Sequence, residues 1–183
     1  APGMRRLACL LVLLAGPVLA LPAGPALAQG RMPASLRELR ATFRCDLVDR
    51  LERIHAVDPA ARDRFLTVWP RDRPGSYVQC IFGDADRILL CEAATGRLKV
   101  PPEAGPGDPA ALRRLGFAAD PEGGNDAQQI PVAAPDAFAR TADLLLATLH
   151  DAYGVRPPVD LVIRAPHARR ARANPPACPV PVG

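Results

Sequence analysis

The sequence predicts an α+β fold in which an antiparallel sheet packs against helices on one of its faces. Three runs with strand character follow one another between residues 65 and 93, and the short loops between them favour antiparallel neighbours. Amphipathic helical patterns lie before and after this group, at residues 36–55 and 135–153. Consecutive strands with helices at either end are typical of a sheet whose helices share one face.

The first helical pattern has apolar residues at every third or fourth position. These residues are Leu36, Leu39, Phe43, Leu47, Leu51 and Ile54. Ser35 and Glu38 have the spacing of a capping box, in which the two side chains satisfy backbone N–H groups at a helix start. Asp58-Pro59 is a stop signal. The pattern therefore predicts one amphipathic helix over residues 36–55.

The three predicted strands are Phe65–Trp69, Tyr77–Phe82 and Ile88–Ala93, separated by turn residues. Side chains alternate along a strand, so Val78, Cys80 and Phe82 share one face of the second strand. With an even number of connecting residues, Leu89 and Cys91 of the third strand join that face. The resulting face is wholly apolar and is predicted to be the core.

The remaining elements follow from turn and helix signals. Asp108-Pro109 and Gly116 bound a short helix through Leu115, and Pro131 confines a strand at Gln128–Val132 to a sheet edge. The second long helix carries Phe138, Leu145, Leu149 and Tyr153 on one stripe, with Gly154 as its stop. A last strand covers Leu161–Ile163, and residues 164–183 are expected to form a disordered tail rich in Pro and Arg.

Residues 1–28 have the three parts of a secretory signal peptide. Arg5 and Arg6 precede an apolar run over 7–21, and Ala26-Leu27-Ala28 comes before Gln29; residues 1–3 are interpreted as an N-terminal scar or an upstream start. The run is short and is broken by Gly16 and Pro17, so it is not expected to span a membrane. We expect cleavage near Ala28/Gln29, a periplasmic or secreted location, and a single domain over residues 29–163.

Several short stretches resemble one known family. Tyr77-Val78-Gln79-Cys80 lies on a strand, Leu112-Arg-Arg-Leu-Gly-Phe117 closes the short helix, and Leu149-x-x-Ala-Tyr-Gly-Val155 ends the long one. In this order they resemble the type III secretion chaperone-like domain family (TY-Chap-like), over about Leu36 to Ile163. The resemblance implies a compact secretion-chaperone-like α+β fold, often dimeric, that binds polypeptide and performs no chemistry. The export signal and the basic tail lie outside it.

The face of the sheet that turns away from the predicted core carries several apolar side chains. Tyr77, Ile81, Ile88 and Leu90 lie there beside Gln79 and Glu92, which is more apolar than a sheet face left to water usually is. The alternative is that the C-terminal strand and loops cover this face. The sequence therefore favours a surface for a protein or peptide partner, with a homodimer as one form. Its predicted partner-binding residues are Trp69, Tyr77, Ile81 and Leu90.

Four cysteines, Cys45, Cys80, Cys91 and Cys178, follow the signal peptide, and an even number in an oxidising compartment favours disulfides. Cys80 and Cys91 can bond if they sit directly opposite each other, with residues 84–87 as the loop. Cys45 and Cys178 are the alternative partners, in a bond that would hold the tail against the body. Unpaired buried thiols remain a third possibility. No Cys-x-x-Cys spacing is present, which argues against structural zinc.

No pattern in the chain indicates catalysis, a metal or a cofactor. Asp84-x-Asp86 is typical of a hairpin turn, and no Gly-x-Ser-x-Gly or Gly-rich phosphate loop is present. His55, His150 and His167 lie at helix ends or in the tail, with His150 beside Asp151 the best candidate for a base. Without the signal peptide's two arginines the net charge falls from +4 to +2, so no nucleic acid is expected.

The sequence thus favours an exported, non-enzymatic binding protein that contacts polypeptide through a sheet face. A small periplasmic enzyme or accessory subunit, with a Cys or His site that the sequence does not place, is the alternative. A stabiliser of the cell envelope acting through the arginines of the tail comes third.

Overall fold

The computed structural model describes residues 32–83, 85–96, 107–172 and 178. The chain divides into residues 1–31 and 32–183, and everything described belongs to the second unit. The predicted signal peptide and residues 173–177 and 179–183 of the predicted tail lie outside the described residues.

The predicted α+β fold is confirmed, and the elements follow the predicted order. Their ends differ from the predicted ones by about two residues, as is usual for boundaries argued from pattern alone. The elements are α1 (Ala34–His55), β1 (Phe65–Pro70), β2 (Val78–Gly83), β3 (Ile88–Ala93), α2 (Pro109–Arg114), β4 (Asp126–Pro131), α3 (Ala137–Ala147), the π-helical η1 (Thr148–Ala152), β5 (Leu161–Arg164) and the 3-10 helix η2 (Pro166–Ala168).

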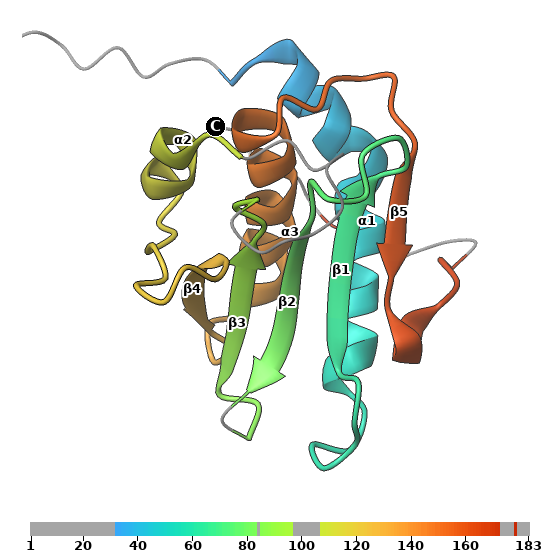
Figure 1. Ribbon diagram of the computed structural model, residues 1–183. Helices are drawn as coiled ribbons and strands as arrows, with labels where there is room; N and C mark the ends of the chain where they lie inside the picture. Colours follow the sequence, from blue (N-terminus) through green and yellow to red (C-terminus); the bar gives the residue numbers. More distant parts are fainter. Residues whose placement is uncertain (1–31, 84, 97–106, 173–177, 179–183) are drawn as a thin grey trace, which may run out of the picture. The chain divides into compact units, whose positions relative to one another are not determined.

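The five strands form one antiparallel sheet in the order β4-β3-β2-β1-β5 (Figure 1). In the central hairpin Cys80 lies opposite Cys91 and Ile81 lies opposite Leu90. This is the even register that the sequence analysis required for an apolar core face. β4, which contains Pro131, and β5 are the first and last strands of the sheet, which agrees with the confinement of proline to sheet edges.

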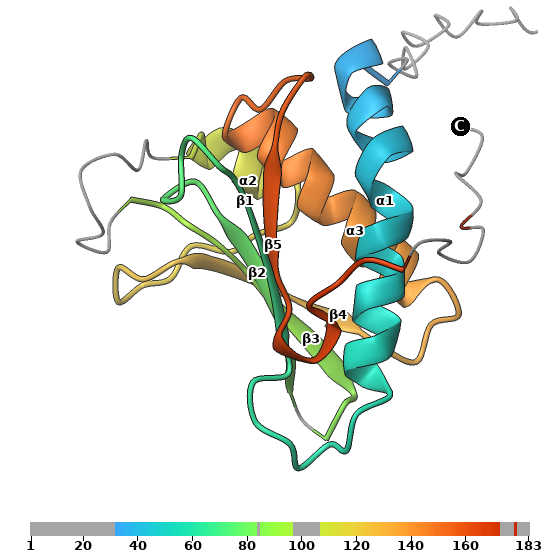
Figure 2. The same ribbon diagram turned by 90° about the vertical axis from the view of Figure 1, so that its right-hand side faces the viewer.

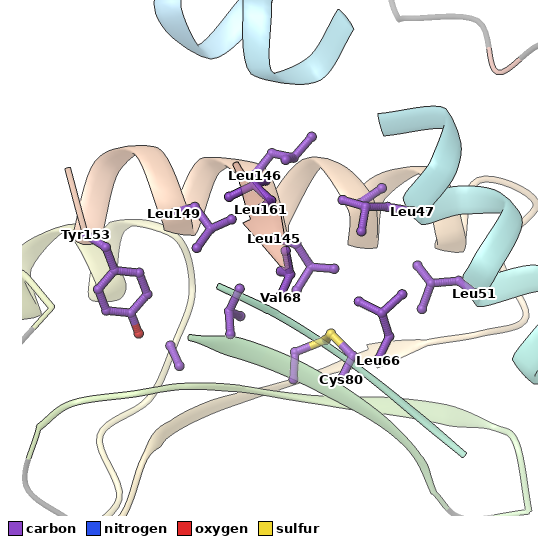
Figure 3. Packing of buried hydrophobic residues seen from close by; sticks show 14 of the residues in the cluster. Leu47, Leu51, Leu66, Val68, Cys80, Leu145, Leu146, Leu149, Tyr153 and Leu161 are labelled. Carbon is purple, nitrogen blue, oxygen red and sulfur yellow. A yellow bond between two sulfur atoms is a disulfide. The ribbon is translucent and has the colours of Figure 1, made fainter. Parts of the chain in front are cut away.

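Helices α1 and α3 pack side by side on one face of the sheet, here called the inner face (Figure 2). Every second strand residue points into this layer, where Leu66, Cys80 and Leu89 are fully buried. Leu47 and Leu51 from α1 and Leu145 from α3 meet them from the helix side (Figure 3). Because apolar surface removed from water contributes about 25 cal/mol per Å², this layer holds both helices against the sheet.

The second long helix changes its hydrogen bonding before it ends. α3 passes into the π-helical turn η1, and the Tyr153 N–H reaches back to the Thr148 carbonyl at 3.3 Å. Gly154 follows with a φ of +66°, a conformation that glycine adopts at little cost. The helix therefore ends at Gly154, as predicted. Tyr153 points from the end of the helix into the core (Figure 3).

The predicted capping box at the start of α1 is wrong. The N-cap residue is Pro33, no side chain caps the helix, and Ser35 lies within the first turn. The Ser35 hydroxyl instead lies 2.7 Å from Nε2 of His150. This contact joins the start of α1 to η1, the turn that follows α3, so a tertiary hydrogen bond takes the place of the local one.

Residues 164–172 are folded, although the sequence analysis placed them in a disordered tail. Ala165 and Ala168 are 2% and 1% exposed. The Arg50 guanidinium of α1 donates to the carbonyl of Ala168 at 2.6 Å, and Arg172 forms an ion pair with the buried carboxylate of Asp49 at 3.1 Å. Backbone carbonyls are obligatory acceptors, so arginines on the outward side of α1 can fix a segment that has few apolar residues.

Both cysteine pairs that the sequence analysis considered are bonded in the structure. Cys80 joins Cys91 across β2 and β3, with a Cα–Cα distance of 4.1 Å, beneath the centre of the sheet. Cys45 of α1 joins Cys178, 133 residues away in the sequence. The second bond holds the C-terminal part of the chain to α1, as expected for the pairing that would fasten the tail.

Candidate functional site

The face of the sheet opposite α1 and α3, here called the outer face, has its side chains in rows that run across the strands. Phe65, Ile81 and Leu90 lie opposite one another on β1, β2 and β3 and form an apolar row. Thr67, Gln79 and Glu92 form the next row, which is polar. In antiparallel pairs, residues directly opposite each other point to the same side, so the register alone sets these rows.

A shallow hollow of about 440 Å³ lies over the outer face, on β1, β2 and the end of β5. We call it the outer hollow. Its volume falls within the range of about 300 to 1,000 Å³ that is usual for ligand pockets. The lining residues are Phe65, Thr67, Trp69, Pro74, Tyr77, Gln79, Ile81 and Arg164.

The apolar part of the outer hollow is accessible to solvent. Ile81 is 37% exposed, and it is the one large apolar side chain in the described part of the chain that counts as exposed. Phe65, Trp69 and Tyr77 are half-buried. Neither α1 nor α3 covers this face, since both pack on the inner one (Figure 2).

The polar row crosses the floor of the outer hollow and fixes the orientation of one amide. The Gln79 Nε2 donates to the Glu92 carboxylate at 2.5 Å, and the Gln79 Oε1 accepts from the Thr67 hydroxyl at 3.5 Å. The glutamine carbonyl therefore faces β1 and its amino group faces β3. The carboxylate of Glu92 is engaged at the far end of this row.

Arg164 lines the outer hollow on the side of β5. It lies opposite Thr67 in the sheet register, and its guanidinium carbon is 5.4 Å from the centre of the Phe65 ring. An arginine placed over an aromatic face gains about 0.5–1 kcal/mol at an exposed site. The contact therefore holds a positive charge beside the apolar lining.

The wall at Tyr77 is supported from the core side by Tyr153. The Tyr153 hydroxyl lies 2.7 Å from the carbonyl oxygen of Ala94 and 3.0 Å from that of Tyr77, so its single proton is shared between the end of β3 and the start of β2. On the outside, the Tyr77 hydroxyl accepts from the side-chain amide of Asn125 at 2.8 Å. These contacts hold one side of the outer hollow in place.

Residues 40–167 match a protein family described as the T3SS (YopN, CesT) and YbjN peptide-binding chaperone 3 family, TY-Chap3. This segment contains every strand of the sheet and all the residues that line the outer hollow. The chain belongs to the TY-Chap3 family. No curated protein and no solved structure gives a significant match.

Membership of TY-Chap3, a peptide-binding chaperone family, confirms the resemblance found in the sequence. It implies a protein partner, and it describes a binding role and no enzymatic one. An open, partly apolar hollow over a sheet is a surface on which a polypeptide could be held. The family and the geometry therefore point to the same kind of ligand.

The structure brings together three of the four predicted partner-binding residues. Trp69, Tyr77 and Ile81 line the outer hollow. Leu90 lies beside Ile81 in the apolar row but lines a separate hollow of about 410 Å³, together with Gly116, Ala118, Ala127, Gln128 and Gln129. Whether any of these residues contacts a partner stays a prediction.

Sequence reasoning missed Phe65, Thr67, Pro74 and Arg164. Side chains that are two residues apart on a strand point to the same face. This alternation along β1 could have placed Phe65 and Thr67 beside Trp69 on the outer face. Arg164 had no such signal. The sequence does not show that β5 pairs with β1, and that pairing is what brings this arginine to the outer hollow.

One hydrogen-bonded chain outside the outer hollow combines a serine, a histidine and an aspartate. Nε2 of His150 lies 2.7 Å from the Ser35 hydroxyl, and its Nδ1 lies 2.5 Å from the carboxylate of Asp151. His150 is 4% exposed. The group has the residue types of a catalytic triad. However, it belongs to the layer of α1 and α3 on the inner side of the sheet, whereas the outer hollow lies on the opposite side.

Within the described residues, no group of three or more metal-ligating side chains is found.

Asp86 lies in the turn between β2 and β3, as the sequence predicted. It has a φ of +68°, and its carboxylate accepts hydrogen bonds from Arg64, at 2.9 Å to Oδ2. No described helix is both long and apolar enough to cross a bilayer.

The Tyr153 phenol gives a pH dependence that can be measured. Burial, together with the negative charges of nearby groups, raises the pKa of Tyr153 above its ordinary value of 10.0. Above pH 10 the unfolded chain therefore loses this proton while the folded chain keeps it. Stability should fall by up to about 1.4 kcal/mol per pH unit from this group as the pH rises above 10.

The variant Tyr153→Phe should remove this decline and lower stability by about 1–2 kcal/mol at pH 7, since the carbonyls of Ala94 and Tyr77 lose the donor that they share. Urea unfolding at pH 7, 10 and 11 measures both effects. Tyr77→Phe is the matched control: its half-buried hydroxyl accepts from Asn125, and the decline should persist in this variant, because burial is the largest cause of the raised pKa of Tyr153. An equal decline in the wild type and in Tyr153→Phe would contradict the assignment.

Proposed function

We propose that this protein is an exported, non-enzymatic binding protein that holds segments of other polypeptides in the outer hollow. The observation that carries the proposal is the open apolar surface formed by Phe65, Trp69, Tyr77 and Ile81 on the side of the sheet that α1 and α3 leave uncovered. Membership of a peptide-binding chaperone family supports it. The signal-peptide pattern of residues 1–28 supports export to the periplasm or beyond.

The size and polarity of the outer hollow suit the apolar side chains of a flexible, extended peptide segment. Fully burying a Leu or Phe side chain contributes about 1.5–3 kcal/mol. Part of this gain is offset by the ordering of the bound segment, which typically costs several kcal/mol. The balance favours reversible binding of extended segments, as a chaperone that must release its client requires.

The binding site contains its own reporter, because Trp69 is the single tryptophan of the chain. An apolar peptide that enters the outer hollow should change the emission of Trp69 in a saturable way. Ile81→Asp should weaken this binding by about tenfold or more, because it places a charge where apolar surface must be buried. Fluorescence titration with short Leu- and Phe-containing peptides measures both effects.

Ala41→Asp is the matched control, since it adds the same charge on the exposed side of α1. It should leave peptide affinity unchanged. Equal affinities for Ile81→Asp and the unchanged chain would refute the proposed surface. Light scattering of the free protein and of its variants measures the oligomeric state alongside the peptide titration. A dimer that Ile81→Asp and Leu90→Glu both convert to a monomer would assign the face to self-association instead.

The competing function is a small hydrolase, and the observation that favours it is the Ser35–His150–Asp151 chain. We expect these three hydrogen-bonded residues to act as a structural link between α1 and η1. The protein should therefore not react with a fluorophosphonate probe, as judged by intact mass. A serine adduct on Ser35 that disappears in His150→Ala, with Ser76 as the internal control residue, would support the enzyme and count against the binding protein.

The export step has an independent test. Expressed from Met4 in a bacterium with two membranes, the chain should be recovered from the periplasm or medium with a mature N-terminus at Gln29. Peptide mass mapping identifies that terminus. Replacing Ala26 and Ala28 with bulky residues should block cleavage, because the site requires small side chains. An uncleaved chain that stays in the cytoplasm would disprove export and leave the binding surface untouched.

A further inference from the structure

The spacing of side chains along β1 sets a pattern for any peptide that lies parallel to it. Phe65, Thr67 and Trp69 all line the outer hollow and are two residues apart. A strand rises about 3.3 Å per residue, so Phe65 and Trp69 are about 13 Å apart with Thr67 midway. An extended peptide has the same rise and directs every second side chain to one side. Its first, third and fifth residues therefore meet these three positions.

The two ends of this track are apolar. Phe65 continues into Ile81 across the sheet, and Trp69 lies near Tyr77 and Pro74 in the same lining. A bound peptide gains most at these ends from apolar side chains, since each one removes its own surface and that of the protein from water. Apolar side chains at the first and fifth residues of a peptide would therefore match the two ends of the track.

A positive charge lies beside the track, between its first and middle positions. Arg164 lies opposite Thr67 in the register and rests over the Phe65 ring. In the described part of the chain no carboxylate forms an ion pair with it. The nearest acid of the same row, Glu92, is on β3 and is engaged by Gln79. Three strand spacings of about 4.8 Å put β3 roughly 14 Å from β5.

We infer that the outer hollow binds extended peptides with an acidic residue at the third of five positions and apolar residues at the first and fifth. This inference rests on the proposed function and names its ligand class. The third side chain lies over Thr67, within reach of the Arg164 guanidinium. A carboxylate there forms charge-assisted hydrogen bonds, whereas a lysine would meet a like charge.

The contact with Phe65 makes this charge more selective than an ordinary surface arginine. The Arg164 guanidinium carbon lies over the Phe65 ring, and this contact limits the rotation of the side chain. Arg164 is otherwise exposed, so its N–H groups can reach an acceptor. A guanidinium that is already oriented loses less side-chain entropy when it binds a carboxylate. The preference for an acidic residue is therefore expected to exceed that of an isolated exposed ion pair.

Four peptides test the inference, each with the five-residue core Leu-Ser-X-Ser-Leu inside a Gly-Ser host. X is Glu, Gln or Lys in three of them, and the fourth moves Glu to the second position with Ser at the third. Trp69 fluorescence and calorimetry give the dissociation constants. The Glu peptide should bind about three- to tenfold more tightly than the Gln peptide, and the Lys and shifted peptides should be the weakest.

Variants of Arg164 connect this preference to one side chain. Arg164→Gln should abolish the difference between the Glu and Gln peptides, Arg164→Lys should keep part of it, and Arg164→Glu should favour the Lys peptide. Arg37→Gln, on the exposed side of α1, removes the same charge on the other side of the sheet and should change nothing. Circular dichroism shows that each variant is folded.

The possible results separate the inference from the function on which it rests. If all four peptides bind the unchanged protein equally well, the acidic preference is overturned while peptide binding stands. If the shifted peptide binds as well as the Glu peptide, the strand-matched spacing is wrong. If neither these four peptides nor any other apolar peptide alters Trp69 emission, the outer hollow is not a peptide site. Both the inference and the proposed function are then refuted.

Discussion

The burial of one sheet face under α1 and α3 is the interaction on which the rest of the structure depends. The strands alternate, so this burial takes every second side chain of β1, β2 and β3 out of water and leaves the others on the opposite side. A shift of one residue between β2 and β3 would exchange the two sets. The pairing of Cys80 with Cys91 lies at the centre of this arrangement, and their disulfide links the two strands in the register that the core requires.

Both α1 and α3 pack on one side of the sheet, so its second side stays open. The same strand register also sets the order of the side chains on that open side. An apolar row, a polar row and Trp69 follow one another along β1, because the strand places every second side chain outward. A neighbouring strand then adds a charge to the middle row through the pairing of Thr67 with Arg164. The surface is therefore a consequence of strand pairing.

The sequence predicted the elements and the inner face well because both depend on local periodicity. Helical stripes, turn residues and the alternation of Val78, Cys80 and Phe82 are all visible in short windows. It failed wherever a distant segment decided the outcome. Ser35 has a capping sequence, but His150, 115 residues further along, takes its hydroxyl. Residues 164–172 have a disordered composition, but arginines of α1 bind their carbonyls. Arg164 could not be placed at the site without knowing that β5 pairs with β1.

The bond between Cys45 and Cys178 has a mechanical consequence. It connects α1 covalently to the C-terminal segment, and the five strands lie between these two cysteines in the sequence. A force that pulls on the chain outside the two cysteines is transmitted through the sulfur atoms and not through the strands. Such a pull could peel the first turns of α1, but the sheet between the cysteines would carry no load. The surface described here would thus keep its shape while the ends of the chain are strained.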